Sequence, residues 1–236
     1  MNLKKIVENI NFKGQSDDRQ IFNIVHDSRK VKQGSLFVAI SGEKSDGHDF
    51  IFEAIDKGAT AILANGRSPV TDKVPILQVK NPRKIMSKIA ANFYNHPSKK
   101  VNIIGITGTN GKTTTTQLVD FILKFNKLSS GSLGTLGFSS PTGIVSTGFT
   151  TPESVDLHQI IRTMVDGGIK YIPMEISSHA IKMHRVDDVD VNIAVFTNLS
   201  PDHLDFHGNM NNYFKTKLKL FENLNEKSTA IINNDD

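Results

Sequence analysis

The chain contains no cysteine, and its 236 residues include no long uninterrupted apolar stretch. Without thiols it can form neither disulfides nor thiolate metal sites, which fits a protein of the reducing cytoplasm. A membrane-spanning helix needs about 20 consecutive apolar residues, so no span is predicted. The first residues carry lysines but no continuous apolar segment, so they do not have the pattern of a signal peptide.

Aromatic residues are scarce at 7%, and the charge is only mildly unbalanced, with a formal net charge of +4. Scattered lysines with few aromatics predict no nucleic-acid-binding surface, whereas a mild positive balance suits a protein that binds nucleotides and other phosphates. Hydrophobic residues make up 38% and charged residues 22%, as in soluble globular proteins. The length suggests one or two domains.

Residues 1–98 are predicted to form a small α/β domain, joined to the rest by the proline-broken stretch 95–100. Short apolar runs predict its strands, and apolar residues at helical spacing predict its helices. The strand candidates are Ile21–Val25, Ser35–Ile40, Ala61–Ala64 and Ile76–Val79, and the helix candidates are Phe50–Lys57 and Arg83–Tyr94.

Residues 99–236 are predicted to form a second α/β domain. Its strand candidates are Val101–Thr107, Tyr171–Ile176, Val191–Thr197 and Thr229–Ile232, and its helix candidates are Thr113–Phe125, Glu153–Asp166 and Met210–Leu224. Alternating strands and helices predict a mostly parallel sheet covered on both faces. A sheet that stops at the last strand lacks expected elements, so we expect this domain to be truncated.

A glycine-rich turn follows the first strand of the second domain, and a helix follows the turn. Strand, glycine turn, Lys-Thr and helix together predict a phosphate-binding loop for ATP, because glycines and a helix N-terminus present backbone N–H groups to phosphate oxygens. The candidate residues are Gly108, Thr109, Asn110, Gly111, Lys112, Thr113 and Thr114. Ile106 stands where the usual motif has its first glycine, so an ordinary glycine turn is the alternative.

Two further polar clusters follow strands of the second domain, at the edge where parallel sheets bind ligands. Glu175 ends one strand and can reach a nucleotide-bound Mg²⁺, or it is simply a solvated glutamate. His203, with Asp202 and Asp205, is a candidate metal or phosphate ligand, or a structural histidine.

Two helix segments and a long loop are also informative. Thr151 is predicted to cap the helix that begins at Pro152. Lys217 and its two alternate neighbours cannot share one helix face, and by themselves they indicate a solvated amphipathic helix. The segment 131–148 is rich in Gly, Ser and Thr and is predicted to be a loop, either binding a polar ligand or flexible. In the first domain, Asp27–Arg29 and Ser41–His48 are polar turns.

The order of these motifs resembles the Mur ligases, and within them the UDP-N-acetylmuramoyl-tripeptide synthetases. The matching segments are His26–Arg29, Gly34–Ala39, Asp46–His48, Gly105–Thr114, Thr150–Glu153, Glu175–His179, His184–Val186, Thr197–Asp205 and Asn233–Asp236. The match spans essentially the whole chain, and implies an N-terminal UDP-binding domain followed by an incomplete central ATPase domain. Residues 1–236 contain no Asp-Asn-Pro-Arg motif, so we expect the C-terminal ligase domain of the family not to be part of them.

The resemblance implies roles for single residues. Ser28, with its two neighbours, resembles the uridine-diphosphate contact, and the loop 41–48 would wrap the same end of the substrate. The residues that resemble the contacts of the muramoyl-dipeptide arm are Thr150, Thr151, Ser177 and Arg185, and those that resemble Mg²⁺ ligands are Glu175 and His203. Thr113 is a further candidate Mg²⁺ ligand because its hydroxyl directly follows the lysine of the turn. Lys217, four residues after Tyr213, matches the lysine that the family carbamylates to hold a second Mg²⁺, and with Lys112 it is the candidate catalytic residue.

The resemblance implies an ATP-dependent ligase of peptidoglycan synthesis. It would join a diamino acid, meso-diaminopimelate or L-lysine, to UDP-N-acetylmuramoyl-L-alanyl-D-glutamate through an acyl phosphate. Met183 replaces a glutamine of many relatives, which removes one expected substrate contact. The alternatives are a fragment that binds ATP and UDP-substrate without catalysis, and another Mur or folylpolyglutamate-type ligase. The sequence predicts no oligomeric state.

Overall fold

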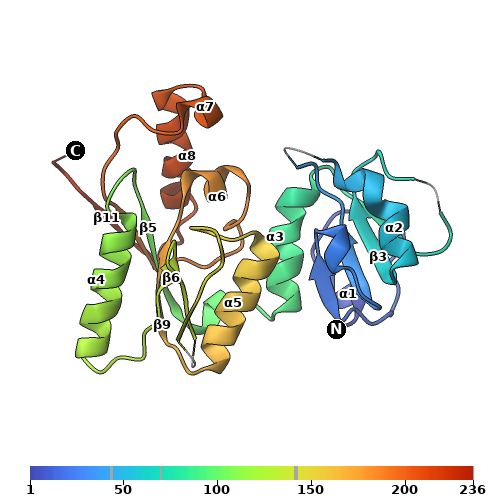
Figure 1. Ribbon diagram of the computed structural model, residues 1–236, viewed down its shortest axis with the longest axis horizontal. Coiled ribbons are helices and arrows are strands. Elements are labelled where there is room, and N and C mark those ends of the chain that lie inside the picture. Colours follow the sequence, from blue (N-terminus) through green and yellow to red (C-terminus); the bar gives the residue numbers. More distant parts are fainter. Residues whose placement is uncertain (43–44, 70, 141–142, 236) are drawn as a thin grey trace. The chain divides into compact units, whose positions relative to one another are not determined.

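The computed structural model divides the chain into two compact units, Met1–Asn95 and His96–Asp236 (Figure 1). It describes residues 1–42, 45–69, 71–140 and 143–235. The division falls inside the predicted linker, of which Pro97–Lys100 forms a short 3₁₀ helix, η3, instead of an open chain. In the part of the chain that the structure describes, no helix is both long and apolar enough to cross a membrane.

The first unit is a four-stranded parallel sheet in the order β1-β2-β3-β4. Its strands are β1 (Asn23–Val25), β2 (Ser35–Val38), β3 (Ala59–Ala64) and β4 (Ile76–Gln78). Its helices are α1 (Leu3–Ile6), η1 (Ser28–Lys30), η2 (Gly47–Phe50), α2 (Ile51–Asp56) and α3 (Pro82–Phe93). The predicted strands and the two longer helices are present, with bounds that differ from the predicted ones by a few residues. The shorter helices α1, η1 and η2 were not predicted, because they are too short to show an apolar period in the sequence.

The central strands of this sheet are continuous apolar runs because both of their faces are covered. All residues of β2 are buried, and its side chains pack with those of β3 and α2. Since the strands are parallel, their carboxyl ends meet at one edge. The turn 27–29 and the loop that begins at Ser41 therefore leave the sheet at the same edge.

The second unit is a seven-stranded sheet in the order β11-β10-β5-β9-β6-β7-β8. Its strands are β5 (Asn102–Thr107), β6 (Leu133–Gly134), β7 (Gly137–Ser140), β8 (Gly143–Val145), β9 (Tyr171–Glu175), β10 (Ile193–Phe196) and β11 (Thr229–Ile232). Its α-helices are α4 (Lys112–Phe125), α5 (Ser154–Asp166), α6 (Ser178–Lys182), α7 (Leu204–His207) and α8 (Met210–Glu222). The predicted α/β class with a mostly parallel sheet is confirmed.

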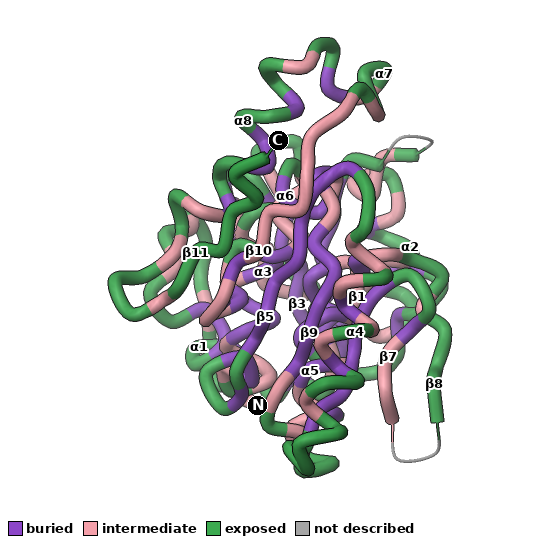
Figure 2. The backbone as a smooth tube through the Cα atoms, turned by 90° about the vertical axis from the view of Figure 1, so that its left-hand side faces the viewer, coloured by how far each residue is buried: buried purple, intermediate pink, exposed green. Residues whose placement is uncertain are grey.

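Helices lie on both sides of this sheet, with α4 on one side and α5 on the other (Figure 1). Figure 2 shows β5 and β9 buried at the centre of the unit. The core joins these strands to α5, α6 and α8 through residues such as Ile103, Leu157 and Leu220. The apolar residues that predicted α4 are instead exposed, and Phe125 keeps 78% of its surface.

Two predictions about the second unit are wrong. The segment 131–148 is no plain loop, since it contains β6 and the hairpin of β7 with β8. Its glycines hid these strands, because they weaken any strand pattern in the sequence. Thr151 does not cap α5, because the cap residue is Glu153 and the helix begins at Ser154. The hydroxyl of Thr151 is directed instead to the backbone of β9, where it donates to the carbonyl of Glu175 at 2.9 Å.

Candidate functional site

The glycine turn between β5 and α4 has the geometry of a phosphate-binding loop. Gly111, with φ of 81°, precedes the first residue of α4, and Gly108 has φ of 147°. Both values favour glycine, and at Gly108 a Cβ would also lie 1.9 Å from the hydroxyl of Thr197. The first N–H groups of α4 have no carbonyl of the preceding turn to bind, so they can receive an anion at this helix end.

The segment that follows β10 holds this turn in place. Asn198 accepts from the backbone N–H of Asn110 at 2.8 Å through its side chain, and from that of Thr109 at 2.9 Å through its carbonyl. The hydroxyl of Thr197 donates to the carbonyl of Asn110 at 2.7 Å. Asn198 was not predicted, although its place directly after a strand of a parallel sheet was the available signal.

Lys112 lies folded over the turn. Its Nζ donates to the carbonyls of Gly108 at 3.1 Å and Thr109 at 2.8 Å. Burial lowers the pKa of Lys112 below its usual range, and the nearby charges of Glu175 and Asp202 partly oppose that shift. The amine is therefore placed where it can exchange these carbonyls for phosphate oxygens.

Glu175 is 1% exposed at the carboxyl end of β9. Its carboxylate accepts from the hydroxyl of Thr113, in the first turn of α4, at 2.9 Å. Thr135, between β6 and β7, donates to the same carboxylate through its N–H at 2.9 Å and its hydroxyl at 3.2 Å. A hydroxyl and a carboxylate this close, beside a phosphate-binding turn, are oxygen ligands of the kind that Mg²⁺ takes with nucleotides.

Lys217 is also 1% exposed, and it lies on the inner face of α8. Its Nζ donates to the carbonyl of Gly108 at 2.7 Å, the same oxygen that Lys112 reaches. Burial lowers the pKa of Lys217 to about 7, and the positive charge of Lys112 contributes to that shift. Lys215 and Lys219 are exposed on the same helix, so the interpretation of a merely solvated helix is wrong for Lys217.

Tyr213, one turn before Lys217, helps to position this lysine. Its ring centroid lies 4.6 Å from the Nζ of Lys217, within the range of a cation–π contact. Its hydroxyl is 3.2 Å from that of Thr109, which in turn lies 3.0 Å from the N–H of Ser200 and accepts from it. Helix α8, the glycine turn and the segment after β10 are thus joined through one buried threonine hydroxyl.

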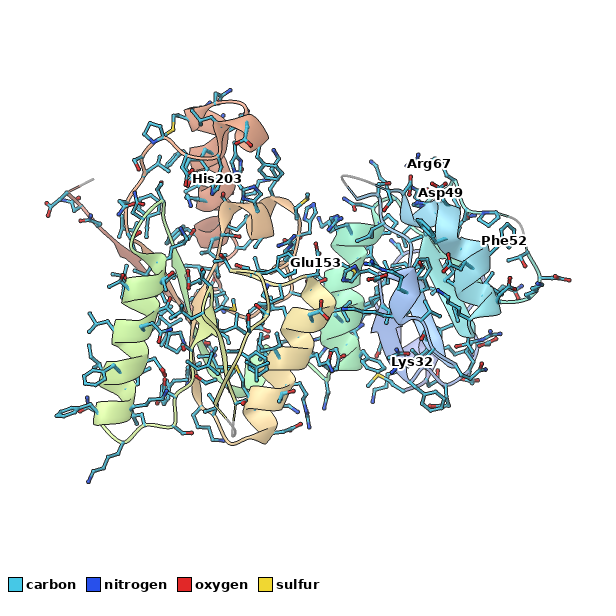
Figure 3. All side chains as sticks on the ribbon, viewed as in Figure 1. Lys32, Asp49, Phe52, Arg67, Glu153 and His203 are labelled. Atoms are coloured by element: carbon cyan, nitrogen blue, oxygen red, sulfur yellow. The ribbon has the colours of Figure 1, made fainter. Side chains whose placement is uncertain are left out.

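Of the four residues predicted to hold the dipeptide arm, three are joined by hydrogen bonds: Thr151, Ser177 and Arg185. Thr151 accepts from the N–H of Ser177 at 3.2 Å, and its carbonyl accepts from Arg185 at 2.9 Å. Arg185 also forms an ion pair of 2.9 Å with Glu153, which lies at the start of α5 (Figure 3). The hydroxyl of Thr150 is 3.0 Å from that of Thr135, whereas the hydroxyl of Ser177 caps α6.

His203 lies just before α7 in the left-handed region, with φ of 51°, and is labelled in Figure 3. Its Nε2 is 3.4 Å from a carboxylate oxygen of Asp202, and its ring is perpendicular to that of His179 at 4.7 Å. Among the described residues, no three His, Asp or Glu side chains gather closely enough to hold a metal. The roles of Thr113, Glu175, His203 and Lys217 as Mg²⁺ ligands therefore stay predictions.

In the first unit, Ser28 begins η1 and is buried, with its carbonyl accepting from Lys57 at 3.3 Å. Asp27 caps η1 and pairs with Arg29 at 2.8 Å, and the hydrogen bonds from Arg29 lower the pKa of Asp27 to about 2. Asp46 holds His48 by accepting from both its N–H and its ring. Residues 43 and 44 of the predicted substrate loop, and residue 236 of the last motif, lie outside the described part of the chain.

Known families and proteins match this chain along its length. The family model for the Mur ligase middle domain matches residues 106–236, and that for the Mur ligase family, catalytic domain, matches residues 20–94. A UDP-N-acetylmuramoyl-L-alanyl-D-glutamate–2,6-diaminopimelate ligase of Clostridioides difficile is 45% identical, over 100% of this chain and 49% of its own length. The enzyme of that name from Caldanaerobacter subterraneus is 46% identical, over 92% of this chain and 44% of its own length.

Solved structures show the same architecture. A structure of a UDP-N-acetylmuramoyl-L-alanyl-D-glutamate–2,6-diaminopimelate ligase matches with a TM-score of 0.82 at 27% identity, over 100% of this chain and 47% of the other. The MurF ligase from Thermotoga maritima in complex with ADP matches with a TM-score of 0.61 at 28% identity, over 91% of this chain and 46% of the other. The chain spans about half the length of the curated relatives it matches.

Proposed function

We propose, from the premise that this chain belongs to the Mur ligase family, that its second unit binds ATP with Mg²⁺ and its first unit binds the uridine-diphosphate end of a muramoyl-peptide substrate. The nucleotide would lie on the turn 108–114, with the Thr113 hydroxyl and the Glu175 carboxylate toward the metal ion. Ser28 would contact the uridine diphosphate, and Thr150, Thr151, Ser177 and Arg185 the dipeptide arm.

The observation that carries this proposal is the position of Lys217. A fully buried lysine whose amine bonds the carbonyl of Gly108 is costly for the fold, because burial of an amine opposes its charge. With a pKa of about 7, the amine is partly neutral at physiological pH. Its lone pair can then add to CO₂ with loss of one proton, giving an anionic carbamate beside the nucleotide.

The reaction we propose joins a carboxylate to an amine in two steps. The substrate carboxylate attacks the γ-phosphorus of ATP, ADP leaves, and an acyl phosphate forms. The amine then attacks the acyl carbon, and phosphate leaves with formation of the amide. When Mg²⁺ is bound, it supplies electrostatic stabilisation of the developing negative charge. Lys112 contributes a fixed positive charge at the transferred phosphate, and the surrounding turn positions the reacting groups.

The relatives' names indicate the substrates. We propose UDP-N-acetylmuramoyl-L-alanyl-D-glutamate as the acyl donor and 2,6-diaminopimelate as the amine, in preference to L-lysine. The pathway is peptidoglycan synthesis, and a cytoplasmic location fits a reaction that consumes ATP and a UDP-linked precursor. The activity is proposed for the whole protein of the type that these relatives represent, since this chain spans about half of their length.

Calorimetric titration tests the proposal directly. The chain should bind ATP in the presence of Mg²⁺ and, at a separate site, UDP-N-acetylmuramoyl-L-alanyl-D-glutamate. Turnover should then be measured with and without the second half of the Clostridioides difficile relative supplied as a separate polypeptide. Binding of both ligands without turnover in either case would favour a non-catalytic binding role, and failure to bind ATP would refute the proposal.

A further inference from the structure

The segment between β6 and β7 is built around the carboxylate of Glu175. Strand β6 pairs with β9 at Leu133 and Met174, so the residues that follow each strand lie side by side. Thr135 uses both of its donors on Glu175, the N–H on Oε1 at 2.9 Å and the hydroxyl on Oε2 at 3.2 Å. Neither contact follows from the sequence, because 40 residues separate the partners.

Gly134 provides a second, independent sign of this arrangement. A Cβ at Gly134 would lie 2.2 Å from Oε1 of Glu175 and 2.7 Å from its Cδ and Cγ. The carboxylate thus occupies the space that a side chain at position 134 would need. The turn accepts only glycine there unless Glu175 moves, so its shape and the orientation of Glu175 depend on each other.

The hydroxyl of Thr135 also contacts the group predicted to hold the dipeptide arm. Its Oγ1 lies 3.0 Å from Oγ1 of Thr150, while Oε2 of Glu175, which accepts from Thr135, also accepts from Thr113 at 2.9 Å. A hydroxyl carries one hydrogen, so Thr135 donates either to Glu175 or to Thr150. While it donates to Glu175, the hydrogen of that Thr135–Thr150 contact must come from Thr150.

We propose that Thr135 is a positioning residue that orients Glu175 toward the phosphate-binding turn and relays the state of the nucleotide site to Thr150. With a cation held beside it, the Glu175 carboxylate would be fixed and the hydroxyl of Thr135 would keep donating to it. Thr150 would then have to donate its hydrogen to Thr135, and its lone pairs would be left to accept from a donor on the substrate. This inference rests on the proposed function, because it assumes that ATP, Mg²⁺ and the UDP-linked dipeptide bind as described above.

Three variants of the chain test the role of Thr135. Thr135→Val removes the hydroxyl and keeps the shape, Thr135→Ser restores the hydroxyl, and Thr147→Val makes the same change elsewhere in the segment. Thr147 is a matched control because its hydroxyl donates to the carbonyl of Phe149 at 2.8 Å. Circular dichroism and thermal unfolding of each variant establish that it is folded.

The first measurement is ATP affinity by calorimetry with Mg²⁺ and with EDTA. The gain in affinity that Mg²⁺ provides should fall about tenfold in Thr135→Val, the usual size for loss of one hydrogen bond to a charged group. Metal-free ATP affinity should not change in any variant, and Thr135→Ser and Thr147→Val should keep the full Mg²⁺ effect. An unchanged Mg²⁺ effect in Thr135→Val, or an equal loss of metal-free affinity, would overturn the positioning role.

The second measurement compares ATP affinity in Mg²⁺ with and without saturating UDP-N-acetylmuramoyl-L-alanyl-D-glutamate. The wild type and Thr135→Ser should show a several-fold difference, and Thr135→Val should show almost none. No difference in the wild type, or the same difference in Thr135→Val, would overturn the relay while leaving the proposed function intact. Absence of ATP binding by the wild type would instead refute the proposed function, and this inference with it.

Discussion

The two units of this chain hold the polar side chains at the ends of their strands in different ways. The sheet of the first unit is parallel and that of the second is mostly parallel, and in both, polar side chains lie beyond the carboxyl ends of parallel strands. At the end of β1 in the first unit, the ion pair is local, since Asp27 pairs with Arg29 two residues away and Arg29 is 85% exposed. Beside the glycine turn of the second unit, the polar contacts span long distances in sequence, 62 residues from Thr113 to Glu175 and 109 from Gly108 to Lys217.

This difference has energetic consequences. An exposed ion pair typically contributes about 0–1 kcal/mol, because solvent screens it and both side chains lose entropy. Removal of one partner from a buried contact leaves the other group without water or a hydrogen bond, at a cost of about 1–3 kcal/mol. The site of the second unit should therefore be far more sensitive to single substitutions than the turns of the first unit.

The largest effect is expected for Lys112→Ala. Loss of the positive charge at the β- and γ-phosphates should weaken ATP binding at least ~100-fold, because this amine is placed directly over the turn. Calorimetry with ATP and Mg²⁺ measures the change, and circular dichroism should show an intact fold. Lys170→Ala, an exposed lysine of the same unit, is the control. Equal ATP affinity in wild type and Lys112→Ala would remove this turn from the nucleotide site.

The next effect concerns the pH dependence of stability through Lys217. Its pKa is about 7 in the folded chain and 10.5 when unperturbed, so between these values the unfolded chain binds more protons. The free energy of unfolding should therefore rise with pH above about 7, by up to about 1.4 kcal/mol per pH unit. Below the folded pKa both states are protonated, so Lys217 should cause no pH dependence there.

The difference between wild type and Lys217→Met in urea unfolding, measured from about pH 6 to 9, isolates this contribution. The exposed lysines of the same helix provide matched controls, since Lys215→Met and Lys219→Met should run parallel to the wild type. If the free energy of unfolding of Lys217→Met has the same pH dependence as that of the wild type, the pKa of Lys217 is not lowered, and its amine is not buried as in the structure.

A smaller effect is expected for Ser28→Ala. Loss of one neutral hydrogen bond should weaken binding of UDP-N-acetylmuramoyl-L-alanyl-D-glutamate by up to ~10-fold. ATP affinity should not change, because Ser28 belongs to the other compact unit. Two titrations on one protein sample give both values. Equal losses in the two affinities would mean that the two sites are coupled or that the uridine site lies elsewhere.

The smallest effect is expected for Asp27→Asn, which tests the local, exposed character of the pair between Asp27 and Arg29. Asparagine can still cap η1, and only the ion pair with Arg29 is lost, so the free energy of unfolding should change by less than ~1 kcal/mol at neutral pH. Because the pKa of Asp27 is lowered to about 2, even this contribution should disappear as the pH falls toward that value. A loss above ~2 kcal/mol at neutral pH would show that the pair is not a local surface contact.

Much of the fold could be predicted from periodicity. The helices α3, α4 and α8 and the strands β5 and β9 lie within two residues of their predicted bounds, because each is a long apolar pattern of one period. The short strands β6–β8 could not be predicted, since a two-residue strand such as Leu133–Gly134 exists only through its pairing with β7 and β9. The predicted cap of α5 was wrong because the hydroxyl of Thr151 donates to a carbonyl of β9, which is distant from Thr151 in the sequence.

The sequence alone determined the chemistry that is available. It predicted the candidate phosphate-binding turn, because strand, glycines, lysine and helix are consecutive along the chain. Tertiary structure decided which other side chains meet that turn. Only the pairing of β9 and β10 with β5, and the packing of α8 in the same unit, bring Glu175, Asn198 and Lys217 to residues 108–113. The same packing removes Lys217 from water and lowers its pKa, because desolvation depends on every element packed around a group and not on its neighbours in sequence.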